Sequence, residues 1–247
     1  MANIFFYARG FTTGRNVPVL DSISDILSLY EQDALDHWIF GNDESTLTGR
    51  ANSRLLKRQA GATVPLTWTQ KALGLPQKNG NGLETPLTDT LSQSFATAGV
   101  FNVQSNAGII ILNGTLGSVQ TTPVGGYALF TSGTNLYITV REPAAVLNSK
   151  VIGAIDPAKP FYVAMSYDKT TKVINVVAVQ GTSNYELTLT TGTYNPTDLP
   201  IYLGNGRYTN TATGSSLVNE FVIWGRSKTI ADLKDVASRM LDRGTIF

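Results

Sequence analysis

Cysteine is absent from the 247-residue chain, and charged residues make up only 15% of it. Without cysteine there are no disulfides, no thiol catalysis and no cysteine-ligated zinc. The formal net charge is +1, so the composition offers no basic surface that would attract the phosphates of nucleic acid. We therefore expect no nucleic-acid partner and a surface covered largely by Thr, Ser, Asn and Gly.

Long apolar runs are also absent. None approaches the roughly 18 residues of a membrane-spanning helix, and Met1 to Arg9 contain neither a basic leader nor a small-residue cleavage site. The expectation is synthesis in the cytoplasm, no signal peptide and no membrane insertion. A role outside the cell would then need another route of release, such as lysis.

Paired carboxylates of the kind used by retaining glycosidases are missing from the sequence. Those enzymes need two carboxyl groups about 5 Å apart, commonly from one strand in a Glu-x-Asp-x-x-Glu pattern. Here Glu142, Glu186 and Glu220 each stand alone, which favours solvated surface charges. The sequence predicts no catalytic residues and a protein that is not an enzyme.

Histidine occurs once, at position 37. A serine triad or a common zinc site would have to be built around this single imidazole, and no Gly-x-Ser-x-Gly elbow accompanies it. Beside Trp38, it is more typical of a partly buried strand residue. Calcium needs only oxygen ligands, which Asp168, Asn175 and Asp198 could contribute, but they are not clustered in one loop. We expect neither metal nor cofactor.

From residue 36 onward, short strands alternate with turns. Asn113-Gly114 predicts a two-residue hairpin between 109–112 and 115–119, because both turn residues tolerate positive φ. Further strands are predicted at 126–130, 136–140, 161–167, 173–179, 185–190, 201–203 and 218–224. Such a series without intervening helices indicates an antiparallel sandwich.

One helix is predicted to close the chain over 229–241. Thr229 and Asp232 form a capping-box-like pair at its start. Gly244 is expected to stop it in a left-handed conformation.

The first 35 residues differ from the rest. Ile4 to Ala8 predict a short strand, and Ile23, Ile26, Leu27 and Tyr30 recur with helical spacing. We therefore divide the chain into a small α/β N-terminal appendage, 1–35, and a body, 36–247. The appendage either packs passively on the body or serves as a docking or oligomerisation element.

Three segments carry a resemblance to a known family. They are Asp36–Gly41, the paired segments Phe161–Asp168 and Val173–Gly181, and the closing series Ile201–Gly204, Glu220–Trp224 and helix 229–241. Together these segments resemble the concanavalin A-like, laminin-G-type jelly-roll family. The resemblance implies an all-β, antiparallel jelly-roll β-sandwich with a C-terminal helix.

A second resemblance is one of style. A non-secretory N-terminal module, no cysteine and a Thr/Gly/Asn-rich jelly-roll body resemble bacteriophage virion proteins. This implies a non-catalytic particle component, in a tail or on a capsid, with other virion proteins and host-surface glycans as partners. It also implies a virion location and a homo-oligomer. The alternatives are a free-standing carbohydrate-binding module or lectin and, less favoured, a glycan-cleaving enzyme.

Sugar recognition needs an aromatic platform together with amide or guanidinium donors. The loop 204–214 offers Asn205, Arg207, Tyr208 and Asn210 between two predicted strands, and Trp68 is the tryptophan most open to exposure. We predict these five as ligand-binding residues. The alternative is a solvated hairpin loop with an incidental tyrosine.

Overall fold

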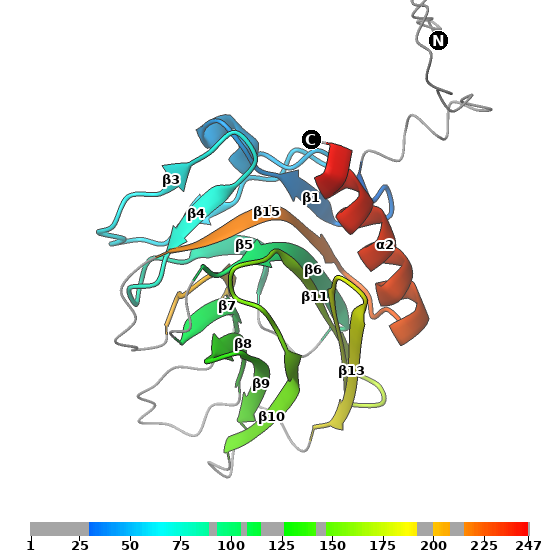
Figure 1. Cartoon of the computed structure of the whole chain (residues 1–247). Coiled ribbons are helices and arrows are strands. Elements are labelled where there is room, and N and C mark those ends of the chain that lie inside the picture. The colour runs from blue at the N-terminus through cyan, green and yellow to red at the C-terminus, as the bar shows by residue number, and fades with distance from the viewer. Residues whose placement is uncertain are drawn as a thin grey trace, which may run out of the picture.

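The computed structural model describes residues 30–88, 93–104, 108–114, 126–141, 147–191, 200–207 and 215–246. Two antiparallel sheets face each other, and one helix lies on the outside of one sheet (Figure 1). The predicted all-β sandwich with a C-terminal helix is confirmed. Within the described ranges, no helix is long and apolar enough to cross a membrane.

The first sheet has eight strands in the order β13-β12-β11-β6-β15-β4-β3, with β1 also paired to β15. The strands are β1 (Asp36–Ile39), β3 (Thr67–Trp68), β4 (Leu73–Pro76), β6 (Phe95–Asn102), β11 (Phe161–Asp168), β12 (Val173–Gln180), β13 (Ser183–Thr190) and β15 (Ser215–Trp224).

The second sheet has seven strands in the order β10-β9-β8-β7-β14-β5-β2. The strands are β2 (Lys57–Arg58), β5 (Leu83–Thr88), β7 (Ile109–Asn113), β8 (Gly126–Ser132), β9 (Asn135–Arg141), β10 (Leu147–Ala154) and β14 (Pro200–Leu203). A short 3-10 helix, η1 (Glu44–Leu47), follows β1.

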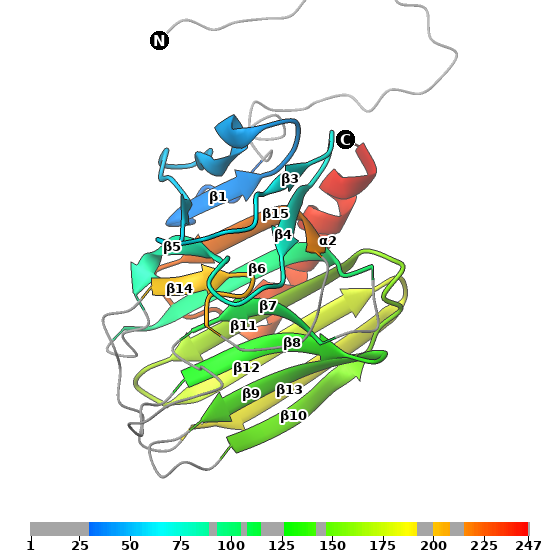
Figure 2. The same ribbon diagram turned by 90° about the vertical axis from the view of Figure 1, so that its left-hand side faces the viewer.

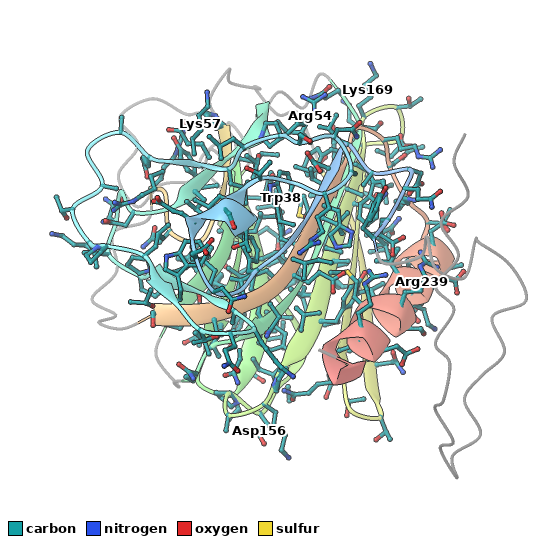
Figure 3. The ribbon with its side chains drawn as sticks, turned by 90° about the horizontal axis from the view of Figure 1, so that it is seen from above. Trp38, Arg54, Lys57, Asp156, Lys169 and Arg239 are labelled. Carbon is teal, nitrogen blue, oxygen red and sulfur yellow. The ribbon has the colours of Figure 1, made fainter. Side chains whose placement is uncertain are left out.

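Apolar side chains fill two layers. The larger core lies between the sheets, where the ring of Trp38 stacks on Phe221 at 5.8 Å (Figure 3). A second core lies beneath helix α2 (Ile230–Ile246), which packs against β6, β11 and β12. Tyr162 joins β11 to α2, because its hydroxyl donates a hydrogen bond to the carbonyl of Leu233 at 2.8 Å.

The start of α2 confirms the predicted cap, and its end does not. The backbone N–H of Asp232 donates to the Thr229 hydroxyl at 3.1 Å, and the Thr229 N–H donates to the Asp232 carboxylate at 3.0 Å. The helix continues to Ile246, so the predicted stop at Gly244 is wrong.

The hairpin predicted at Asn113-Gly114 is also wrong. Asn113 lies within β7, paired with Ala128 of β8 on one side and Tyr202 of β14 on the other. Both edges of β7 are therefore occupied at Leu112 and Asn113, so Asn113 is a strand residue and not a turn residue. The predicted strands 126–130 and 136–140 pair with each other as β8 and β9, and the paired segments Phe161–Asp168 and Val173–Gly181 form β11 and β12.

A single buried carboxylate shapes the loop after β1. Asp36 accepts backbone hydrogen bonds from His37, Ala51 and Asn52 at 2.8, 3.0 and 3.1 Å, and from Arg54 at 2.6 Å. Its side chain is fully buried. One residue thus satisfies three backbone donors of an irregular loop and one donor of β1.

We expect Asp36→Ala to lower the free energy of unfolding by about 3–5 kcal/mol, because it leaves four backbone N–H groups without their acceptor. Asp43→Ala is the matched control, since Asp43 is exposed and caps only η1; its loss should cost about 1 kcal/mol. Urea denaturation measures both. Equal, small losses would contradict the role given to Asp36.

Residues 31–35 are held to the sandwich by ion pairs. Glu31 receives hydrogen bonds from Arg239 at 2.7 and 3.0 Å and from Arg243 at 3.1 Å; both arginines belong to α2 (Figure 3). Asp33 accepts from the Trp224 indole at 2.9 Å and from Lys228 at 2.7 Å, and it also pairs with Arg226. The predicted appendage otherwise lies in residues 1–29, outside the described residues, and stays a prediction.

Glu220 is not the surface charge that the sequence suggested. Its side chain is buried on β15, where Arg243 donates to it at 2.6 and 2.9 Å and the His37 ring nitrogen Nε2 lies 2.7 Å away. His37 Nδ1 accepts the backbone N–H of Glu31 at 2.8 Å. Because Nδ1 acts as an acceptor, Nε2 is the ring nitrogen that can carry the proton of a neutral imidazole, and it faces the Glu220 carboxylate.

The acidic groups of residues 31 and 33 predict loss of stability in acid. Burial raises the pKa of Glu31, but the hydrogen bonds and charges of Arg239 and Arg243 lower this pKa by more than burial raises it. The pKa of Glu31 therefore lies below its ordinary value of 4.5. Burial likewise raises the pKa of Asp33, and Lys228, Trp224 and Arg226 outweigh it. A carboxyl whose pKa is depressed by folding stabilises the fold above its unfolded pKa and loses this effect as pH falls through the folded pKa.

We therefore expect Tm to fall as pH drops below about 4.5. Glu31→Gln should lower the unfolding free energy at pH 7 by about 3 kcal/mol, because Arg239 loses its carboxylate and Arg243 keeps only Glu220, and should flatten the decline of Tm with acid. Glu44→Gln, at an exposed residue, serves as the control. A Glu31→Gln curve parallel to that of the unsubstituted protein would refute the assignment.

Candidate functional site

Buried amides fix the loops that contain the predicted site. Gln77 accepts the Ile110 N–H at 2.8 Å and donates to Ser216 at 3.3 Å, so it joins the two sheets. The predicted ligand residue Asn205 is fully buried, and its amide donates to the Gln77 carbonyl at 2.8 Å. Asn81 accepts from Thr63 and Val64. Asn205 therefore belongs to the scaffold that orders this end of the sandwich.

Arg207 is half-buried and lies against an aromatic ring. Its guanidinium carbon is 4.9 Å from the centre of the Tyr202 ring, and Nη2 donates to the Tyr202 hydroxyl at 3.4 Å. Gly206 permits this packing, because a Cβ there would come within 2.2 Å of the same ring. Tyr202 is itself buried. The contact holds the guanidinium over β14 as a cation–π pair.

The structure places Trp68 in a different sheet from β14, the strand that precedes Arg207. Trp68 is half-buried on β3, in the other sheet, where it packs against the main core. Tyr208 and Asn210 lie outside the described residues. The role of these residues in ligand binding therefore stays a prediction.

Figure 2 looks onto the outer face of the seven-stranded sheet. Alternate residues of its strands, such as Leu129 and Ile138, enter the core, so their neighbours point outward. Helix α2 lies on the opposite side of the molecule, against the other sheet (Figure 1).

A stacked aromatic pair lies on this face. Phe130 of β8 and Tyr137 of β9 are cross-strand partners, with ring centres 5.2 Å apart and planes inclined by 11°. Both rings are half-buried, and Val151 beside Tyr137 is 51% exposed. We call Phe130, Tyr137 and Val151 the aromatic platform.

Hydrogen-bonding groups flank the platform along the strands. Ser132 and Asn135 are paired one step beyond it, and the Asn135 amide lies 3.5 Å from the Tyr137 hydroxyl. On the other side, exposed Ser149 shares a 2.7 Å hydrogen bond with Thr139. The arrangement offers a flat apolar surface between hydroxyl and amide groups. The alternation of apolar and polar residues in 136–140 puts Tyr137 and Thr139 on one face of the strand, but gives no sign that the ring is accessible.

The described residues do not assemble the oxygen ligands considered for calcium. Asp168 accepts from the N–H groups of Thr170 and Thr171 and from the Ser227 hydroxyl, which places it in the turn after β11. Asn175 accepts from Thr188 on the neighbouring strand. Asp198 lies outside the described part of the chain, within which no cluster of three or more His, Cys, Asp or Glu residues is present.

No protein-family model and no curated protein matches the chain. Solved structures do match it. The binding domain of Paraclostridial Mosquitocidal Protein 1 is 8% identical, with a TM-score of 0.56 over 81% of this chain and 51% of its own. The botulinum neurotoxin serotype D ligand binding domain in complex with N-acetylneuraminic acid is 9% identical, with a TM-score of 0.54 over 84% and 51%.

A third similar structure is the CBM40 of the Ruminococcus gnavus IT-sialidase, bound to α2,3-sialyllactose. It is 14% identical, with a TM-score of 0.51 over 66% of this chain and 96% of its own. The chain thus spans about half the length of the toxin domains and nearly all of the carbohydrate-binding module. The likeness is one of fold, and it establishes a concanavalin A-like sandwich.

The different environments of Asn205 and Arg207 predict different costs of truncation. Asn205→Ala should destabilise the protein by about 1–3 kcal/mol, because the buried Gln77 carbonyl loses its donor. Arg207→Ala removes a half-exposed cation–π contact and should cost about 0.5–1 kcal/mol. Chemical denaturation of both variants checks this. The reverse order would mean that the amide scaffold is not what orders the loops.

Proposed function

We propose that the chain is a non-catalytic, lectin-like domain that binds glycans through the aromatic platform. The observation that carries the proposal is the accessible pair Phe130–Tyr137 with serine and asparagine side chains beside it. A pyranose ring has an apolar face of C–H groups and a rim of hydroxyls. The first needs an aromatic surface and the second needs donors and acceptors at its edge.

The comparisons support this proposal in a general way. Two of the similar structures are named for complexes with a sialic acid or a sialylated glycan, and each similar fold belongs to a binding domain or module. These facts favour the lectin interpretation over a glycan-cleaving enzyme. Fold alone does not carry function, so the platform residues themselves must be tested.

The bacteriophage interpretation remains a separate prediction. Residence in a virion, homo-oligomerisation and contact with other virion proteins rest on compositional style. A lectin that acts on its own is the version that the comparisons favour. Mass spectrometry of purified particles tests the particle role directly.

The platform predicts a ring-dependent affinity. A glycan array that includes α2,3-sialyllactose should identify a ligand, and Tyr137→Ala and Phe130→Ala should each raise its Kd about tenfold, or about 1.4 kcal/mol, in calorimetric titration. Tyr185→Ala is the control, since Tyr185 is a half-buried ring on β13 of the other sheet. A Kd unchanged by both platform variants, or an array without any ligand, would rule out the proposal.

A further inference from the structure

A cavity of about 370 Å³ lies where β1 and β4 meet along the same edge of β15. Pairing with β4 ends at Val218, and pairing with β1 begins at Glu220. Between them, the ladder of β15 with β6 shifts register, which marks a bulge at Asn219. Bulges of this kind commonly lie beside binding sites, because they turn side chains out of the regular pleat.

The wall of the cavity is built from two loops held at fixed spacing. The Asn42 N–H donates to the Thr69 carbonyl at 2.6 Å, and the Asn219 amide donates to the Lys71 carbonyl at 2.8 Å. Gly41 passes so close that a Cβ there would lie 2.4 Å from the Gln70 carbonyl. These contacts keep the opening in place without a ligand.

The floor of the cavity carries no net charge. It includes Glu220 and Arg243, which pair at 2.6 Å, and the pair continues to Glu31 and Arg239. The formal charges of two carboxylates and two guanidiniums cancel, and the His37 Nδ1 accepts a backbone N–H. Of the described residues that line the cavity, Glu220 alone has an acidic side chain.

The rim adds two positive charges. Arg50 and Lys71 line the cavity, and both are exposed. The acidic member of the lining, Glu220, is already bound to Arg243 and His37. An anion entering the cavity would therefore meet two cations and the amides of Asn42 and Gln70, beside the apolar side chain of Ile39. Cation-assisted hydrogen bonds to an oxyanion are the strong kind.

We propose that this cavity binds a small oxyanion-bearing molecule of monosaccharide size. Its volume falls within the usual range for ligand pockets, roughly 300–1,000 Å³. The oxyanion is held by Arg50 and Lys71, while the rest of the molecule contacts Ile39. The cavity is lined by the end of β1 and the segment after it, by Gln70 and Lys71, and by residues of β15 and α2. The aromatic platform lies on β8, β9 and β10 of the other sheet, so the cavity is separate from it and does not rest on the proposed glycan function.

The test is a titration of the whole chain with small molecules, in which changes in the NMR chemical shifts of backbone amides report binding. The probes are N-acetylneuraminic acid, inorganic phosphate and neutral N-acetylglucosamine. We expect either or both anions to shift the amides of Gly41, Asn42 and Asn219, more strongly at low salt, and the neutral sugar to leave them unchanged. Response to the acidic sugar alone identifies a carboxylate ligand, and response to phosphate alone identifies a phosphate-bearing one.

Variants separate a built site from a general attraction of charge. Arg50→Gln with Lys71→Gln should weaken anion binding at least tenfold, whereas Lys57→Gln with Lys169→Gln, which removes the same charge at exposed positions outside the cavity, should not (Figure 3). Thr46→Trp fills the cavity and leaves its cations in place, so it should also abolish binding. Each variant's Tm reports whether it folds.

Three outcomes would overturn the proposal. The first is an absence of shifts with both anions. The second is equal weakening by the two charge-removing pairs, and the third is equal binding of the neutral sugar. Because these variants leave Phe130 and Tyr137 untouched, failure here is distinguishable from failure of the platform.

Discussion

The hydrogen-bond ladder along β15 is the constraint on which the rest of the structure depends. One edge pairs with β6, and the other pairs first with β4 and then with β1. Phe221 and Ile223 enter the core between the sheets, while Val222 and Trp224 enter the core beneath α2. Glu220 anchors both β1, through His37, and α2, through Arg243. The register shift in its ladder with β6 lies at Asn219, which also lines the cavity.

The two candidate surfaces differ in chemistry as well as position. The aromatic platform is open, nearly flat and flanked by neutral hydrogen-bonding groups, which suits the face of a sugar ring. The cavity near β1 is a partly open hollow, and Arg50 and Lys71 at its rim form no ion pair with the described residues, which suits an oxyanion. Both are supported by the sandwich, whose regular strands and satisfied loops hold side chains in place before any ligand arrives.

Local signals were visible in the sequence, whereas long-range pairing was not. The β11–β12 hairpin and the Thr229 cap depend on neighbouring residues, and both were predicted. The central strand β6 was not predicted, because Ala96, Ala98 and Gly99 are poor strand formers. Ala96 and Ala98 belong to the core beneath α2, and Gly99 lies close against the Phe101 ring. Burial of Glu220 could not be predicted either, since its partners are distant in the chain. The rings of the platform lay on predicted strands, but accessibility depends on the whole fold.

The central claim is that a concanavalin A-like sandwich presents Phe130 and Tyr137 as a sugar-binding surface. The most direct measurement is a crystal structure of the chain with the best glycan found on an array. The account predicts a pyranose ring lying flat against these two side chains, with its hydroxyls hydrogen-bonded to Asn135 or Ser149. A glycan bound elsewhere, with both rings uncovered, would contradict it.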